Sequence, residues 1–245
     1  MSLVDSFEKQ GNFLFKYRGQ LPVLLFLISI PFIFLSSETN SFFQFICNII
    51  SVSITLIGLF IRFYTIGTTP KGTSGRNTHK QIADFLNSTG IYSMVRHPLY
   101  LGNYLIWLGI SIFTYSLYFT IILTLLFWLY YERIIFAEER FLEKKYGLKY
   151  LNWSSETPVF VPSFKKFKKP SLPFSIKSVF RREYAGVLAT VVGFSFVEIV
   201  RTYYLTNSLN LSSLIYKILI LISLIVLVLR YMKHNTNILN ETDRS

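Results

Sequence analysis

Residues 99–131, LYLGNYLIWLGISIFTYSLYFTIILTLLFWLYY, form a stretch of 33 residues without a single charged side chain. One straight helix of this length would measure about 50 Å, whereas the hydrocarbon core of a membrane is about 30 Å thick. The stretch therefore fits either one overlong helix or a tight helical hairpin that turns near residues 114–116.

The composition of the whole chain is that of an integral membrane protein. Hydrophobic residues make up 51% of the 245 residues and charged residues only 16%. The charged residues lie in blocks between long apolar runs, a pattern typical of membrane helices rather than of a soluble domain. Because the formal net charge of +12 lies in these loops, it indicates a positive-inside bias, and no nucleic-acid partner is predicted.

Basic residues separate the two models of the long stretch. Twelve Lys and Arg residues lie in 132–183 and five in 62–98, whereas the connections 36–41 and 202–210 have none. Only a hairpin puts both basic loops on the same side of the membrane as both chain ends.

The predicted fold class is therefore all-α, a polytopic helical membrane protein with about six transmembrane helices. The tight hairpin supplies two of them, and the other four are predicted at 21–35, 42–61, 184–200 and 211–229. We expect both termini to be cytoplasmic and the membrane to be a bacterial inner membrane. Three parts follow from this order: N-terminal helices in 1–65, a core with the two large loops and the hairpin in 66–165, and a C-terminal hairpin in 166–245.

Polar residues cluster just before and just after the hairpin. Residues 90–104 read GIYSMVRHPLYLGNY, and residues 138–150 read EERFLEKKYGLKY. Arms of similar length would bring Arg96 and His97 close to two glutamates at one membrane surface. Pro98 fixes its own φ and disfavours helix just before it, so Arg96 and His97 should lie in a bend at a helix start.

Each of these residues also has a purely structural interpretation. An arginine at a membrane boundary commonly anchors a helix, paired glutamates at a helix end are commonly solvated, and interfacial tyrosines commonly form an aromatic belt. The joint occurrence of the two groups on one side of the membrane favours a functional site. Glu198 and Arg201, three residues apart, are spaced for a helical ion pair.

The two segments resemble a known family. The pattern Gly90-x-Tyr92-x3-Arg96-His97-Pro98-x-Tyr100-x-Gly102 is similar to that of the isoprenylcysteine carboxyl methyltransferases and the related phospholipid methyltransferases. The second half also fits, as Glu138-Glu139-x2-Leu142-x3-Tyr146-Gly147-x2-Tyr150 followed by Pro158-x3-Pro162. The resemblance covers about residues 88–162. Two positions depart from it: Trp153 stands where tyrosine is frequent, and Glu156 where a basic residue is frequent.

The resemblance implies that the chain is an enzyme that binds S-adenosylmethionine in a cytoplasmic pocket and takes a lipid substrate from the bilayer. When the family's functional residues are carried over to the matching positions, Arg96 and Glu139 are the implied catalytic pair at the reaction centre. The implied cofactor contacts are Tyr92, His97, Pro98, Tyr100, Gly102, Glu138 and Tyr150. The single cysteine, Cys47, excludes a cysteine-based zinc site, and no metal is predicted.

The chemistry of the methyl acceptor stays open between an anion and an amine. A carboxylate or phosphate, such as that of lipid A or a phospholipid head group, is already ionised, and Arg96 could hold it. An amine must first lose a proton, and Glu139 would then be the candidate base. Residues 71–80 are either a phosphate-binding loop or a solvated linker. Arg76, Asn77 and Asn103 are the predicted substrate contacts, and the lysines in 165–169 are expected to meet anionic lipid headgroups.

Two other functions remain as alternatives. One is a sterol-type membrane reductase that uses NADPH, since such enzymes resemble this family near their carboxyl end. The other is a small non-enzymatic transporter, which would need paired polar residues at mid-membrane.

Overall fold

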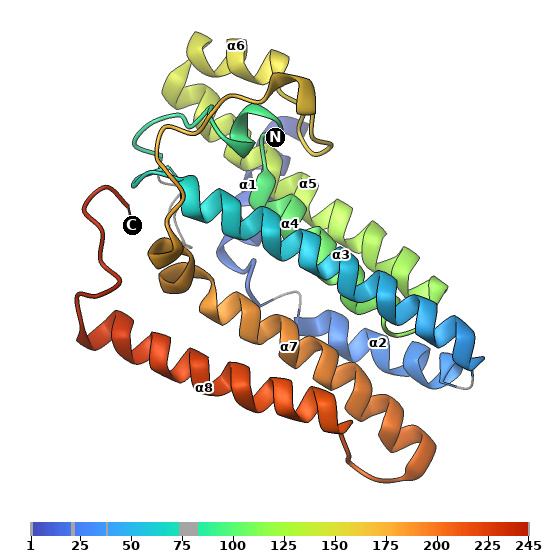
Figure 1. The fold of residues 1–245 in the computed structure, drawn as a ribbon. Helices are drawn as coiled ribbons and strands as arrows, with labels where there is room; N and C mark the ends of the chain where they lie inside the picture. The colour runs from blue at the N-terminus through green and yellow to red at the C-terminus, as the bar shows by residue number, and fades with distance from the viewer. Residues whose placement is uncertain (1, 21–22, 38, 74–82, 245) are drawn as a thin grey trace.

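The computed structural model describes residues 2–20, 23–37, 39–73 and 83–244. Most of these residues lie in helices. The long helices lie alongside one another, and the larger loops lie at one end of the bundle (Figure 1). The helices are α1 (Leu3–Lys16), α2 (Val23–Ser36), α3 (Ser41–Thr68), α4 (Pro98–Ile112), α5 (Leu117–Tyr146), α6 (Leu148–Glu156), α7 (Ile176–Thr206) and α8 (Ser213–Asn235), with short 3-10 turns at η1 (Ile91–Ser93) and η2 (Phe164–Lys166).

The predicted hairpin is confirmed. Helix α4 ends at Ile112 and α5 begins at Leu117, so the uncharged stretch turns back within four residues. Tyr115 takes a positive φ of 62°, which is uncommon for a residue other than glycine and makes the tight reversal. The Ser116 hydroxyl then caps α5 by accepting a hydrogen bond from the backbone N–H of Phe119 at 3.3 Å.

Polar contacts from other helices hold this turn. The Tyr115 hydroxyl donates to Oδ1 of Asn48 at 2.9 Å, and the Arg201 guanidinium lies 3.9 Å from the centre of the Tyr115 ring. Arg201 also donates to the backbone carbonyl of Phe113. The predicted pairing of Glu198 with Arg201 is therefore wrong: the Glu198 carboxylate accepts instead from the backbone N–H of Ser212, at 2.6 Å.

Four helices, α3, α5, α7 and α8, are long and apolar enough to cross a membrane, which confirms a polytopic helical membrane protein. The other two predicted spans are the shorter apolar helices α2 and α4, of 14 and 15 residues. At 30 residues, α5 would measure about 45 Å and is longer than the hydrocarbon core is thick. Its last turns, which carry the glutamates, therefore extend beyond the apolar layer.

Close packing of α3 on α4 brings a charged residue of α3 to the hairpin. A Cβ atom added at Gly102 would lie 2.6 Å from Cγ of Arg62, and one added at Gly58 would lie 2.8 Å from the backbone oxygen of Gly102. Small residues at such crossings let two backbones approach closely. Gly102 thus makes room for α3.

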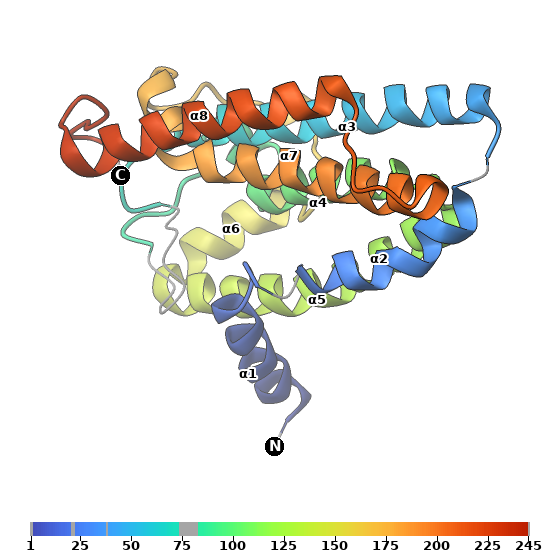
Figure 2. The same ribbon diagram turned by 90° about the horizontal axis from the view of Figure 1, so that it is seen from below.

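Helix α1 was not predicted, although Ser2 and Asp5 form a capping box at its start. It packs on the far part of α5, where a Cβ atom on Gly11 would lie 2.1 Å from the backbone oxygen of Arg133. The Arg133 guanidinium lies 3.6 Å from the centre of the Phe7 ring. Figure 2 shows α1 projecting from the bundle beside α5. The predicted division at 1–65, 66–165 and 166–245 stays a prediction.

Candidate functional site

The segment before α4 has the predicted bent conformation. Gly90 has a φ of 60°, the turn η1 follows, and His97 at φ −122° and ψ 63° precedes Pro98, the first residue of α4. The backbone of this segment is fixed from the other side of the hairpin. The Arg96 N–H donates to the Pro158 carbonyl at 2.9 Å, and residues 163 and 168 make further backbone bonds to Met94 and Gly90.

The predicted meeting of basic and acidic side chains is present. Nη1 of Arg96 lies 2.9 Å from Oε2 of Glu139, and Nε2 of His97 lies 3.0 Å from the other oxygen of that carboxylate. Glu138 accepts from the Tyr100 hydroxyl at 2.8 Å. His97 is only 7% exposed, so these contacts are largely shielded from solvent.

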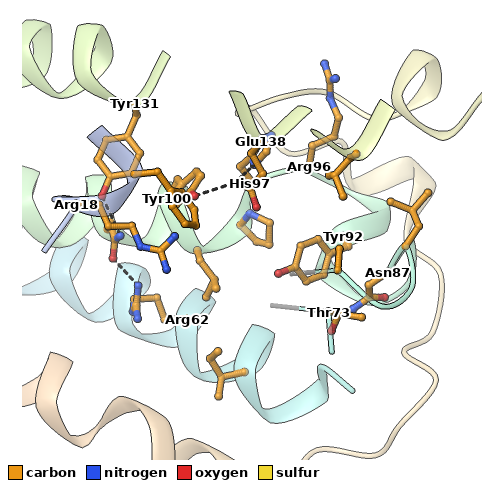
Figure 3. A pocket seen from close by; sticks show the side chains of 18 of the residues that line it. Arg18, Arg62, Thr73, Asn87, Tyr92, Arg96, His97, Tyr100, Tyr131 and Glu138 are labelled. Atoms are coloured by element: carbon orange, nitrogen blue, oxygen red, sulfur yellow. Dashed lines mark hydrogen bonds and ion pairs between the residues drawn. The ribbon is translucent and has the colours of Figure 1, made fainter. Parts of the chain in front are cut away.

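A cavity of about 320 Å³ opens beside this cluster (Figure 3). Seven predicted site residues line it: Tyr92, Arg96, His97, Pro98, Tyr100, Asn103 and Glu138. Three others do not line it. Gly102 faces α3, Glu139 stands behind Arg96 and His97, and Tyr150 is buried nearby. The predicted substrate contacts Arg76 and Asn77 lie outside the described residues.

Tyr150 on α6 has an unusual environment. Its hydroxyl is buried close to Arg96 and Glu139 but makes no well-formed hydrogen bond with any part of the chain that the structure describes. Burial, and after it the nearby Glu139 carboxylate, raise the pKa of Tyr150, so the hydroxyl stays protonated at neutral pH. A buried donor without a partner is costly unless it meets water or a ligand.

Several residues that line the cavity were not among the predicted site residues. Aromatic and polar side chains stand near its loop end, and charged side chains from three elements stand at its inner end. The first group is Thr73, Phe85, Asn87, Phe141 and Trp153, and the second is Arg18, Arg62, Arg182 and Glu183. In the sequence, the second group is distinguished only by its position beside apolar runs. This position is equally typical of residues that anchor a helix at the membrane surface, so it does not indicate a binding site.

Two of the inner charged residues, Arg62 and Glu183, form a connected group with Asn103 and Tyr131. Nε and Nη2 of Arg62 bind the two carboxylate oxygens of Glu183, at 2.8 and 2.9 Å. Nη1 of Arg62 donates to Oδ1 of Asn103, whose amide donates to the Tyr131 hydroxyl at 3.2 Å. The contacts fix both ends of the Asn103 amide and hold the Arg62 guanidinium in the cavity wall.

Comparison with known proteins gives a family for the middle of the chain. Residues 46–149 match the model of the family described as phospholipid methyltransferase. The Cupriavidus metallidurans protein named cobalt-zinc-cadmium resistance protein CzcN is 36% identical over 100 residues, which are 41% of this chain and 46% of that protein. The nickel-cobalt-cadmium resistance protein NccN of Alcaligenes xylosoxydans is 35% identical over 86 residues, 35% of this chain and 40% of that protein.

A eukaryotic enzyme is a more distant relative. The protein-S-isoprenylcysteine O-methyltransferase of Saccharomyces cerevisiae is 24% identical over 118 residues, 48% of this chain and 49% of the enzyme. The chain thus spans less than half the length of each of these relatives. No solved structure shows significant similarity to it. Both motif-bearing arms of the hairpin lie mainly within the matched segment, and this segment is similar to the isoprenylcysteine and phospholipid methyltransferases.

Proposed function

We propose that the protein transfers a methyl group from S-adenosylmethionine to a lipid or lipidated acceptor embedded in the membrane. The observation that carries the proposal is the Arg96–Glu139–His97 cluster beside a cavity at the loop end of the membrane helices. This cluster lies within the family segment. The methyltransferase names of the family and of the yeast relative support the reaction class.

The cavity has the size and the donor set that S-adenosylmethionine needs. Its volume of about 320 Å³ lies in the range of small-molecule pockets, about 300–1,000 Å³. Tyr92, Phe141 and Trp153 offer aromatic faces to an adenine ring or a cation. Glu138 and Asn87 offer oxygen and amide groups for hydroxyl or ammonium groups. When bound, the cofactor supplies a methyl group carried on a sulfonium cation.

Arg96 and Glu139 have different roles in this proposal. Arg96 lines the cavity and pairs through its guanidinium with Glu139, which does not line it, and we propose that Arg96 contacts the acceptor. Both carboxylate oxygens of Glu139 are engaged, one by Arg96 and one by His97. We therefore assign Glu139 as a positioning residue that holds both side chains, in place of the base that an amine acceptor would require.

The protein is an integral membrane protein, and we propose that the end with the cavity faces the cytoplasm of a bacterial cell. The basic residues gather in the loops at this end, in agreement with the positive-inside bias. The terminal helices would then place both chain ends on the cytoplasmic side. The described residues hold no cluster of three or more His, Cys, Asp or Glu that could bind a metal.

Binding and transfer can be tested separately. The protein, purified in detergent, is titrated by calorimetry with S-adenosylmethionine and, in a parallel experiment, with NADPH. Labelled S-adenosylmethionine is then supplied with total membrane lipids. We expect S-adenosylmethionine to bind and label to enter one lipid class, whereas binding of NADPH alone would establish a reductase instead.

Variants test the cluster in the same assay. Arg96→Ala and Glu139→Ala should abolish transfer while leaving expression intact. Arg96→Ala removes the guanidinium, and Glu139→Ala removes the carboxylate that holds this guanidinium in position. Arg140→Ala is the matched control, since Arg140 pairs on the protein surface with Glu143 at 2.7 Å. Equal activity of all three variants would contradict the proposed site.

A further inference from the structure

Helices α7 and α8 form an edge of the bundle outside the family match. Both follow residue 149, where the matched segment ends. Figures 1 and 2 show α8 lying alongside α7 at this edge. Of the α8 residues, all of which the structure describes, only Val226 is buried. In a membrane, most of the surface of α8 therefore faces lipid.

A hollow of about 460 Å³ lies between these two helices. Its walls are apolar, because Ala185, Leu188, Ala189 and Val192 of α7 stand opposite Val226 of α8. The four α7 residues recur at helical spacing and share one face over a length of about 10 Å. Two of them are alanines, whose short side chains leave the space open. Such a hollow fits a hydrocarbon chain better than a polar ligand.

The polar end of this hollow carries positive charge. Arg230 and His234 line it there, one and two turns after Val226, together with Tyr184. They also line an adjacent hollow of about 420 Å³ on α8. Both side chains are exposed, and neither makes a hydrogen bond or an ion pair with the described part of the chain. Two cationic or hydrogen-bonding groups are thus available beside an apolar groove.

No acid in α8 balances this charge. Residues 213–240 contain no Asp or Glu, and the Lys233 ammonium lies 5.3 Å from the centre of the Tyr184 ring. The acids of the neighbouring segments are held elsewhere, in contacts of Glu183 with Arg62, of Glu241 with Ser175 and of Asp243 with Lys71. The end of the hollow is therefore complementary to an anion, and a zwitterionic headgroup would bring its own cation toward Arg230 and Lys233.

We propose that this hollow binds one anionic phospholipid, with an acyl chain between α7 and α8 and its phosphate at Arg230 and His234. The Arg230 guanidinium offers a planar fork that matches phosphate, and the His234 ring has an N–H donor whether or not it is charged. This lipid is a bound partner and not the methyl acceptor, because the hollow shares no lining residue with the cavity beside Arg96. The proposal does not depend on the proposed function.

Photo-crosslinking tests the position and the headgroup together. Full-length protein in an uncharged detergent receives phosphatidylglycerol with a photoreactive group on its acyl chain, and the labelled peptides are identified by mass spectrometry. We expect the label to concentrate in residues 184–192 and 226–234. Unlabelled phosphatidylglycerol should compete at least about tenfold better than phosphatidylcholine. A label spread evenly over the lipid-facing helices, or equal competition by the two lipids, would overturn the proposal.

Two variants test the headgroup contact and the chain contact separately. Arg230→Gln should lower the affinity for phosphatidylglycerol about ten- to a hundredfold, as expected for loss of one charge-assisted hydrogen bond. Ala189→Phe should also prevent labelling, because the ring occupies the hollow while Arg230 keeps its charge. Both positions are exposed, so the fold should be retained.

Each variant has a matched control on α8. Lys217→Gln removes one positive charge at the other end of this helix, and Val228→Phe adds an aromatic ring at an exposed position that lines neither hollow. Both controls should be labelled like the wild type. Wild-type labelling of Ala189→Phe and Arg230→Gln would disprove the site. An equal loss in Lys217→Gln and Arg230→Gln would show attraction by net charge alone and would also disprove it.

Two further measurements separate a lipid site from a site for free anions. Inorganic phosphate should not compete with the labelled lipid, since it lacks the acyl chain that fills the hollow. Competition as strong as that of phosphatidylglycerol would rule out the lipid. Phosphatidylglycerol should raise the melting temperature of the wild type, because a ligand that binds only the folded state stabilises it. The rise should be smaller in Arg230→Gln, and an equal rise in both would contradict the headgroup contact.

Discussion

At the scale of single residues, most polar groups around the cavity have a partner. Glu139, Glu138 and Asn103 each make at least two polar contacts there. The Tyr150 hydroxyl and Nε of Arg96 are exceptions, because both are buried at this network without a well-formed hydrogen bond in the described structure. The Tyr150 donor is available to a ligand, in agreement with the cofactor role that the family resemblance implies for this residue.

Replacing Tyr150 by phenylalanine tests this role. The free protein should keep its melting temperature or gain slightly, because no hydrogen bond is lost and a desolvated hydroxyl is removed. The affinity for S-adenosylmethionine should fall about tenfold, as expected for loss of one hydrogen bond. Thermal unfolding and calorimetric titration of the same sample give both values.

The matched control is Tyr146→Phe. The Tyr146 hydroxyl donates to the Ala83 carbonyl at 2.7 Å, so this variant should lose about 1 kcal/mol of stability and keep its cofactor affinity. If Tyr150→Phe binds S-adenosylmethionine as tightly as the wild type, Tyr150 is not a cofactor contact.

At the scale of elements, glycines decide how closely the membrane helices pack. Gly109 of α4 lies against α3, where an added Cβ would be 2.0 Å from Oγ1 of Thr55 and 2.6 Å from the Ser51 carbonyl. Gly186 of α7 is different, because its added Cβ would find only Oε2 of Glu183, at 3.5 Å. The same residue type is therefore essential for packing in one helix and replaceable in another.

Alanine at the two positions should act in opposite directions. Gly109→Ala must push α3 away from α4 and should cost about 1–3 kcal/mol through overpacking, despite the better helix propensity of alanine. Gly186→Ala should be neutral or stabilising by up to about 1 kcal/mol. Thermal unfolding in one detergent measures both, and a loss of stability at Gly186 equal to that at Gly109 would refute the packing argument.

The elements also show how far the sequence allowed prediction. The hairpin and the meeting of Arg96 and His97 with Glu138 and Glu139 were predictable, because length and charge left few alternatives. The structure lengthens α7 to include Arg182 and Glu183, which from the sequence were part of a basic loop. The burial of Glu183 beside Arg62 depends on how distant helices pack, and no local sequence pattern predicts it. The glycine at position 102 likewise predicts a close neighbour, but the sequence does not indicate whether that neighbour is a ligand or α3.

At the scale of the whole molecule, the C-terminal tail connects α3 and α7 at the cavity end of the bundle. Arg244 donates to the carbonyls of Gly67 and Pro173, and the backbone N–H of Lys71 donates to the Asp243 carbonyl at 2.9 Å. The Glu241 carboxylate accepts from the hydroxyls of Ser175, at 2.6 Å, and Ser178, at 2.8 Å. The tail thus fixes the start of α7, the helix that carries Arg182.

Docking of this tail should depend on pH. Burial acts to raise the pKa of Glu241, but the hydrogen bonds from Ser175 and Ser178 outweigh it, and the pKa lies below its ordinary value. A lowered pKa in the folded state stabilises docking above the unfolded pKa of about 4.3, and this stabilisation is lost as the pH falls through the folded value. The protection factors of residues 236–244, which are exchange rates corrected for the intrinsic pH dependence of amide exchange, should therefore be high at neutral pH and lower below about pH 4.

Glu241→Gln removes the titrating group and should make these protection factors independent of pH in the acidic range. Glu156→Gln, on an exposed carboxylate of α6, is the control and should retain the wild-type dependence. An identical acid transition in the Glu241 variant would show that another group controls the tail.

The unbroken length of α5 has a consequence for the surroundings in which the protein works. The same helix carries the lipid-facing residues and, some turns later, the two glutamates that bind Arg96, His97 and Tyr100. In a thicker bilayer, more of α5 lies within the apolar layer. In a thinner bilayer, more of α5 extends into water, or the helix tilts. The depth of these side chains below the headgroups is therefore tied to membrane thickness, and under the proposed function the lipid composition of the membrane would set which acceptors come within reach.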